Sequence, residues 1–108
     1  MSGYKYETVV RSPQFRKEMK RAEKRGLNPL EAEAVIDLLR RGEPLPEKYH
    51  DHPLKGRYKG YRDCHINPDW VLIYKKIEDK LILFLAHTGT HSDLSFSRKK
   101  TPTSTSGR

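Results

Sequence analysis

The sequence predicts one α+β domain in which two helices near the N-terminus pack on a small antiparallel sheet. Two capped helical segments follow each other in the first half of the chain, and three strand candidates joined by short turns follow in the second half. The length of 108 residues leaves room for a single hydrophobic core. These observations favour a two-layer domain with helices on one side and strands on the other.

The first half of the chain contains the signals for one strand and two helices. Residues 4–11 are rich in β-branched and aromatic side chains, which predict a strand. Residues 12–13 place a serine N-cap before a proline, and Gly26 ends the helix that follows. Residues 28–29 repeat this start with Asn-Pro, and Gly42 ends the second helix.

The second half of the chain predicts three consecutive strands after a loop. Residues 43–54 carry three prolines and therefore form an extended crossing loop. The strand candidates are residues 58–66, 70–76 and 81–87. Because short turns join them, we expect them to pair in antiparallel fashion. The third candidate is apolar on both faces, which predicts a central position in the sheet.

Composition restricts the partners and the cellular setting. The net charge of +8 favours a nucleic-acid partner, an acidic protein partner or both, although a solvated cationic face gives the same bias. No apolar run is long enough to span a membrane and Cys64 stands alone, so we expect a cytoplasmic protein that does not bind membranes. We expect one domain over residues 1–96 and a basic, disordered tail over residues 97–108.

The histidines are concentrated in one part of the chain, and none lies in a predicted helix. All five fall in loops or near strand ends: His50, His52, His65, His87 and His91. Strand alternation puts Asp63 and His65 on one face, and Asp69 follows the next turn. Imidazole titrates near neutrality and a neighbouring carboxylate fixes its tautomer, so this group suits proton transfer on a phosphate-bearing polymer. The alternative for any single histidine is an ordinary exposed side chain.

Basic and aromatic residues accompany the histidines. Four cations could neutralise phosphates if they share a surface with the imidazoles: Lys55, Arg57, Lys59 and Arg62. Trp70 is either a core residue or a platform on which a base stacks. We expect no bound metal, because Thr-Gly-Thr rather than a helical turn separates His87 from His91 and no paired cysteines occur.

Four short motifs stand out in the second half of the chain. They are HPLKG at residues 52–56, KGYRD at 59–63, PDWVLIYK at 68–75 and TGTHSDL at 88–94. In this order and with these gaps, they resemble the YafQ branch of the RelE-like bacterial toxins. The helical half fits more loosely, so the resemblance covers residues 4–96. It implies the RelE-like toxin fold.

The resemblance implies a toxin of a type II toxin–antitoxin system that cleaves mRNA on the ribosome. In such a reaction the nucleotide 2′-hydroxyl attacks the adjacent phosphate, and neither a metal nor another cofactor is required. On the matching positions, His52, His65 and Asp69 belong to the network that handles protons and the scissile phosphate. His91 is the general acid that protonates the leaving 5′-oxygen.

The resemblance also implies supporting residues and partners. Trp70 supports the site, and Phe96 is the aromatic that positions the mRNA. The expected partners are an acidic antitoxin of the ribbon-helix-helix type, the 70S ribosome and its mRNA. Operator DNA is reached only through the complex with the antitoxin.

Two positions depart from the family pattern. His87 stands where the family usually has arginine, which stays charged and grips a phosphate with two donors. Phe96 lies one residue later than the family's aromatic. These departures leave attenuated cleavage open, together with a non-catalytic module that blocks translation by occupying the ribosome. A relative that poisons DNA gyrase is the less favoured alternative, because it gives no reason for the His/Asp group.

Overall fold

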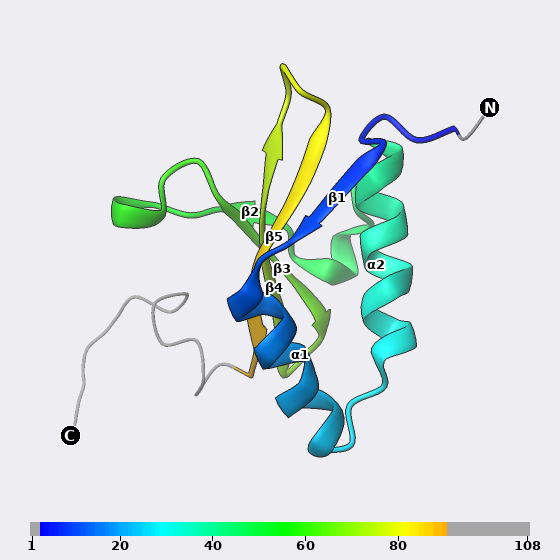
Figure 1. Cartoon of the computed structure of the whole chain (residues 1–108), viewed down its shortest axis with the longest axis vertical. Helices are drawn as coiled ribbons and strands as arrows, with labels where there is room; N and C mark the ends of the chain where they lie inside the picture. The colour runs from blue at the N-terminus through cyan, green and yellow to red at the C-terminus, as the bar shows by residue number, and fades with distance from the viewer. Residues whose placement is uncertain (1–2, 91–108) are drawn as a thin grey trace.

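The computed structural model describes residues 3–90, which form a five-stranded sheet with two long helices on one side (Figure 1). The strand order across the sheet is β1-β5-β4-β3-β2. The elements in chain order are β1 (Thr8–Arg11), α1 (Pro13–Lys24), α2 (Pro29–Arg41), η1 (Glu47–Tyr49), β2 (His52–Pro53), η2 (Gly56–Tyr58), β3 (Arg62–Asn67), β4 (Trp70–Ile77) and β5 (Ile82–Gly89).

The sheet is mixed, which corrects the expectation of a purely antiparallel sheet. The pairs β2–β3, β3–β4 and β4–β5 are antiparallel, as short connections require. β1 instead runs parallel to β5, with Thr8 opposite Ile82. Both helices lie in the chain between β1 and the other strands. This long connection allows β5 to pair with β1 in the same direction. The helices are also not the first elements, because β1 precedes them.

The local signals at the helix ends act as the sequence predicts. The Ser12 hydroxyl accepts a hydrogen bond from the Phe15 N–H at 2.9 Å and caps α1. The Asn28 side chain accepts from the Leu30 N–H at 3.0 Å and caps α2. Gly42 ends α2 with a φ of 79°, in the left-handed region that favours glycine.

Three parts of the strand pattern differ from the sequence-based expectation. The predicted strand over residues 4–11 begins only at Thr8. The predicted strand over residues 58–66 begins only at Arg62, because residues 56–58 form the short turn η2. The predicted crossing loop contains the two-residue strand β2, which pairs with the start of β3. β5 is an interior strand, as its two apolar faces indicate, and lies between the edge strand β1 and the middle strand β4.

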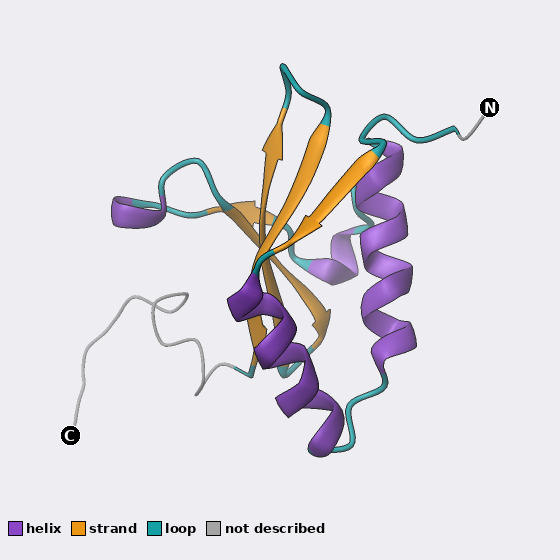
Figure 2. Ribbon diagram, in the orientation of Figure 1, coloured by secondary structure: helices purple, strands orange, loops and turns teal. Residues whose placement is uncertain are grey.

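The main core fills the space between the sheet and the two helices. Its largest fully buried side chains include Trp70, Tyr6, Tyr74, Phe15 and Leu39. Figure 2 shows both long helices on one side of the sheet, while the chain around β2 and η2 extends from the other side. In the described part of the chain, no helix has the length and apolarity that crossing a bilayer requires.

A smaller apolar cluster lies on the opposite face of the sheet. Val71, Ile73 and Ala86 form it, and the partly buried Leu54 and Tyr61 pack against it from the connection between β2 and β3. We call this face, which is turned away from α1 and α2, the loop face. Because β3 alternates, Cys64 and Ile66 enter the main core, whereas Asp63 and His65 belong to the loop face.

Candidate active site on the loop face of the sheet

His52 is held by a buried carboxylate and by a backbone carbonyl. Pairing of β2 with β3 puts His52 opposite Asp63, and the His52 Nδ1 lies 3.1 Å from Asp63 Oδ1. The same Nδ1 lies 2.9 Å from the carbonyl oxygen of His50. With two acceptors beside it, Nδ1 carries the hydrogen, and Nε2 is the ring atom left for proton transfer. The Asp63 side chain is 3% exposed and that of His52 is 51% exposed, so the support is buried and the imidazole reaches solvent.

The backbone at His50 is unusual in a way that serves this arrangement. His50 has a φ of 49°, which a non-glycine residue rarely adopts. It ends η1 in a left-handed turn, and its carbonyl oxygen accepts the hydrogen bond from His52. The turn therefore links a strained backbone position to the orientation of the candidate catalytic ring.

His65 lies on the same face of β3 as Asp63 and is half-buried. The centroids of the His65 and His50 rings are 5.4 Å apart. Asp69 is exposed in the turn between β3 and β4, where its backbone N–H donates to the Asn67 side chain at 3.0 Å. The sequence predicts Asp69 as the carboxylate near His65, while the structure adds Asp63 as the carboxylate beside His52.

His87 lies on β5 with a second carboxylate beside it. Its Nδ1 is 3.3 Å from Oε1 of Glu18, which α1 supplies. A β-bulge interrupts the pairing of β4 with β5 between Ile73 and Tyr74, and His87 is opposite Ile73. Bulges of this kind often re-aim side chains near functional sites. The Tyr58 ring lies 6.4 Å from the His87 ring in an edge-on arrangement.

A hollow of about 260 Å³ adjoins His87. Side chains from α1, β5 and the connection between β2 and β3 line it: Ser12, Gln14, Tyr58, Tyr61, Phe84, Ala86 and His87. Polar atoms are therefore available at a concave part of the surface next to an imidazole.

Trp70 is a core residue, which corrects its place among the expected RNA-contacting side chains. Its indole is 0% exposed, so no base can stack on it in this conformation. The Trp70 Nε1–H donates to the Thr88 hydroxyl at 2.9 Å, and that hydroxyl donates to the Val71 carbonyl at 2.9 Å. Trp70 therefore ties β4 to β5 at Thr88, the residue after His87.

Arg62 lies on the helix side of the sheet, away from the imidazoles. It faces Tyr74 across β3 and β4 and makes an ion pair with Asp51 at 3.0 Å. This hydrogen-bonded carboxylate raises the pKa of Arg62, whose guanidinium stays charged. Asp51 also accepts a hydrogen bond from the Tyr74 hydroxyl. Arg62 therefore fastens the chain before β2 to the sheet, which is a different task from the expected phosphate binding.

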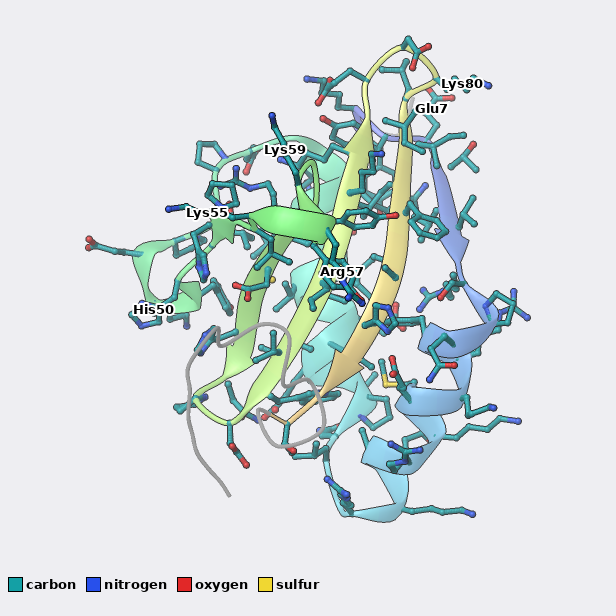
Figure 3. All side chains as sticks on the ribbon, turned by 90° about the vertical axis from the view of Figure 1, so that its left-hand side faces the viewer. Glu7, His50, Lys55, Arg57, Lys59 and Lys80 are labelled. Carbon is teal, nitrogen blue, oxygen red and sulfur yellow. The ribbon has the colours of Figure 1, made fainter. Side chains whose placement is uncertain are left out.

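The other three cations are exposed on the connection between β2 and β3. Lys55, Arg57 and Lys59 flank or belong to η2. Figure 3 looks onto the loop face and shows all three on the segment that stands out in front of the sheet, with His50 nearby at one side. They lie on the same side of the molecule as His50, where they are exposed to solvent.

Some expected features lie outside the described residues or have no chemical role in them. His91, Phe96 and the proposed tail from residue 97 onward fall beyond residue 90. Cys64 is fully buried, and burial raises the pKa of its thiol, so it acts as a small core residue and not as a nucleophile. Within residues 3–90, the His, Cys, Asp and Glu side chains form no group of three or more that could hold a metal ion.

Together these features define a small α+β protein with a candidate acid–base site beside a cationic loop. The site has one imidazole with a fixed tautomer, a second histidine on the same face and a third beside a carboxylate. Such groups can accept and donate protons at a phosphodiester, while the cations of the loop compensate its charge.

Residues 7–96 match the model of a family described as bacterial toxin of type II toxin–antitoxin system, YafQ. The match covers more than half of the chain, so the chain belongs to the YafQ family of bacterial toxins.

Individual relatives support the same assignment. The chain is 48% identical over 84 residues to the mRNA interferase toxin YafQ of Escherichia coli K12, which covers 77% of this chain and 89% of that protein. The crystal structure of YafQ from E. coli BL21(DE3) has a TM-score of 0.74 at 44% identity and covers 80% of this chain and 94% of that one. The toxin in the crystal structure of the E. coli DinJ–YafQ complex has a TM-score of 0.74 at 43% identity, with 82% and 97% covered.

Proposed function

We propose that this chain is an mRNA interferase that inhibits translation by cleaving mRNA on the ribosome. The observation that carries the proposal is the arrangement of His52, whose Nδ1 lies 2.9 Å from the His50 carbonyl oxygen and 3.1 Å from the buried Asp63 carboxylate while its ring is exposed. An exposed imidazole with one defined tautomer is what transfer of a proton at RNA requires. Membership of the YafQ family and 48% identity to an mRNA interferase toxin support the same activity.

The proposed reaction uses the RNA's own 2′-hydroxyl as the nucleophile. A base on the loop face removes the hydroxyl proton, and the oxygen attacks the adjacent phosphorus. The bond to the 5′-oxygen of the next nucleotide breaks, and an acid protonates that oxygen. The products are therefore a 2′,3′-cyclic phosphate on one fragment and a 5′-hydroxyl on the other.

The residues of this chain divide these tasks. His52 Nε2 is the proposed base, and His65 lies on the same face as a second group that can hold a proton. His91, which is outside the described residues, is the proposed acid, and Asp69 is proposed to orient the histidine network. Lys55 and its neighbours on the loop bind the flanking phosphates.

The proposed partner in the resting cell is an acidic antitoxin. A YafQ relative with 43% identity has been solved in complex with the antitoxin DinJ. On this chain, α1 exposes a row of basic side chains that suits an acidic segment: Arg16, Lys17, Lys20, Arg21 and Lys24. We place this complex in the cytoplasm and assign the toxin activity to residues 1–96.

The test is cleavage of a defined mRNA in a bacterial translation reaction and in the same reaction without ribosomes. The proposal expects cleavage only when ribosomes translate the message, with the same outcome in the presence of a chelator that spares the ribosome's magnesium. Translational arrest with intact mRNA would instead support the non-catalytic alternative. DNA damage without loss of mRNA would point to gyrase.

We expect the affinity for a non-cleavable RNA to fall steeply with salt, because the loop cations release counterions from the phosphates. Replacing Lys59 by Gln should make the slope of log K against log salt shallower by about 0.7 for single-stranded RNA. Replacing Lys80, an exposed lysine in the turn between β4 and β5, provides the matched control. An equal slope for Lys59→Gln and the parent chain would show that Lys59 does not contact the RNA phosphates, contrary to the proposal.

A further inference from the structure

Glu18 is a buried acid in a helix whose exposed residues are mostly basic. Its side chain is 10% exposed, and it shares the buried side of α1 with Phe15 and Ala22. Burying a carboxylate is costly unless hydrogen bonds compensate for the lost water. Its position between the helix and β5 therefore needs an explanation beyond packing.

The Glu18 carboxylate accepts a backbone hydrogen bond from β5 beyond the point where β1 stops pairing with that strand. β1 pairs with β5 only as far as Leu85, so the outer edge of β5 beyond this point faces α1. There the Thr88 N–H donates to Glu18 Oε1 at 3.0 Å, and the Gln14 side chain donates to Oε2 at 3.0 Å. Glu18 thus takes the place of a strand partner at the end of β5.

The same carboxylate also contacts the imidazole of the preceding residue. The His87 Nδ1 lies 3.3 Å from Oε1 and 3.4 Å from Oε2 of Glu18. A carboxylate oxygen accepts hydrogen bonds, so this contact favours the tautomer in which Nδ1 carries the hydrogen. The His87 side chain, which is 25% exposed, then presents Nε2 as the nitrogen that exchanges protons at the adjoining hollow.

We propose that Glu18 is a positioning residue that fixes the tautomer and the orientation of His87 for RNA cleavage. This inference rests on the proposed function. The Glu18 side chain joins α1, which carries the basic surface, to the end of β5 at His87 and Thr88. The site then contains two imidazoles with a buried carboxylate close to Nδ1, which is Asp63 at 3.1 Å for His52 and Glu18 at 3.3 Å for His87.

The first test measures the tautomer of His87 without reference to activity. Nitrogen-15 shifts of its ring, recorded on the full chain at a pH where the ring is neutral, should show the Nδ1–H form. Replacing Glu18 by Ala should shift the ring toward the Nε2–H form that free histidine prefers. Replacing Glu23, an exposed acid on the same helix, should leave the ring unchanged. An Nε2–H ring in the parent chain would overturn the proposal.

The second test is a double-mutant cycle on mRNA cleavage with Glu18→Ala and His87→Gln. If Glu18 acts through His87, its replacement lowers the rate roughly tenfold or more in the parent chain, as loss of an orienting partner does. It should then cost nothing further in the His87→Gln chain. An equal loss in both backgrounds would show a purely structural role and would overturn the proposal.

The two readouts separate this proposal from the proposed function. A parent chain with the Nδ1–H tautomer that fails to cleave mRNA contradicts the proposed function and leaves the Glu18–His87 contact established. A parent chain that cleaves mRNA with His87 in the Nε2–H form keeps the function and rejects Glu18 as its positioning residue.

Discussion

Replacement of His52 by Ala is expected to lower the rate of mRNA cleavage by about 10²–10⁴-fold, the usual contribution of a general acid or base. The physical reason is the loss of the exposed Nε2, the proposed proton acceptor for the 2′-hydroxyl. The His52 side chain is half exposed, but its removal also takes a contact from the buried Asp63 carboxylate, so we expect a stability cost of about 1–3 kcal/mol beside the loss of rate. The measurement is the single-turnover rate on ribosomes, together with the urea midpoint of the same variant.

The matched control for His52→Ala is His50→Asn. This change removes a neighbouring imidazole but keeps the backbone carbonyl that accepts from His52, and asparagine tolerates the left-handed backbone at this position. We expect a far smaller loss of rate than for His52→Ala. Equal losses of rate for the two variants would contradict the assignment of His52 as the proton acceptor, because either histidine would then contribute equally.

Replacement of Trp70 by Ala is expected to destabilise the domain by about 3–5 kcal/mol, because it empties the largest buried site in the core. Small domains are stable by only about 5–15 kcal/mol, so this single change removes a large part of the total. Trp70→Phe keeps most of the volume and loses the hydrogen bond to Thr88, for about 1 kcal/mol. Urea unfolding followed by circular dichroism measures both values.

The Trp70 variants also decide how this residue affects activity. If Trp70 acts through the fold, the activity lost at a given temperature should follow the folded fraction, and Trp70→Phe should retain most of it. A stable Trp70→Phe chain that no longer binds RNA would show instead that the indole contacts RNA directly, contrary to its full burial here.

The helices and four of the five strands could be predicted because their signals are local. Ser12 and Asn28 cap helices through contacts within three residues, and short turns determine the pairing of β3, β4 and β5. The direction of β1 depends on a contact between the two ends of the domain, with Thr8 opposite Ile82. No local pattern determines such a pairing, so the strand was predicted within residues 4–11 but its parallel direction was not.

The orienting carboxylates of the site were harder to predict than its histidines. Asp63 lies beside His52 only because β2 forms, and a two-residue strand that contains proline has no clear sequence signal. Glu18 was missed because α1 is strongly basic, which is typical of a solvated helix face. The available signal was its spacing from Phe15 and Ala22, which places it on the buried side of α1.

The most direct test of the account is the chemistry of the cleaved RNA ends. An attack by the 2′-hydroxyl under imidazole catalysis must leave a 2′,3′-cyclic phosphate upstream and a 5′-hydroxyl downstream. Replacing the ribose at the cleaved position by 2′-deoxyribose must abolish the cut. We predict these ends for the parent chain on translating ribosomes. Fragments that carry a 3′-hydroxyl and a 5′-phosphate, or cleavage that persists at the 2′-deoxy position, would contradict the account.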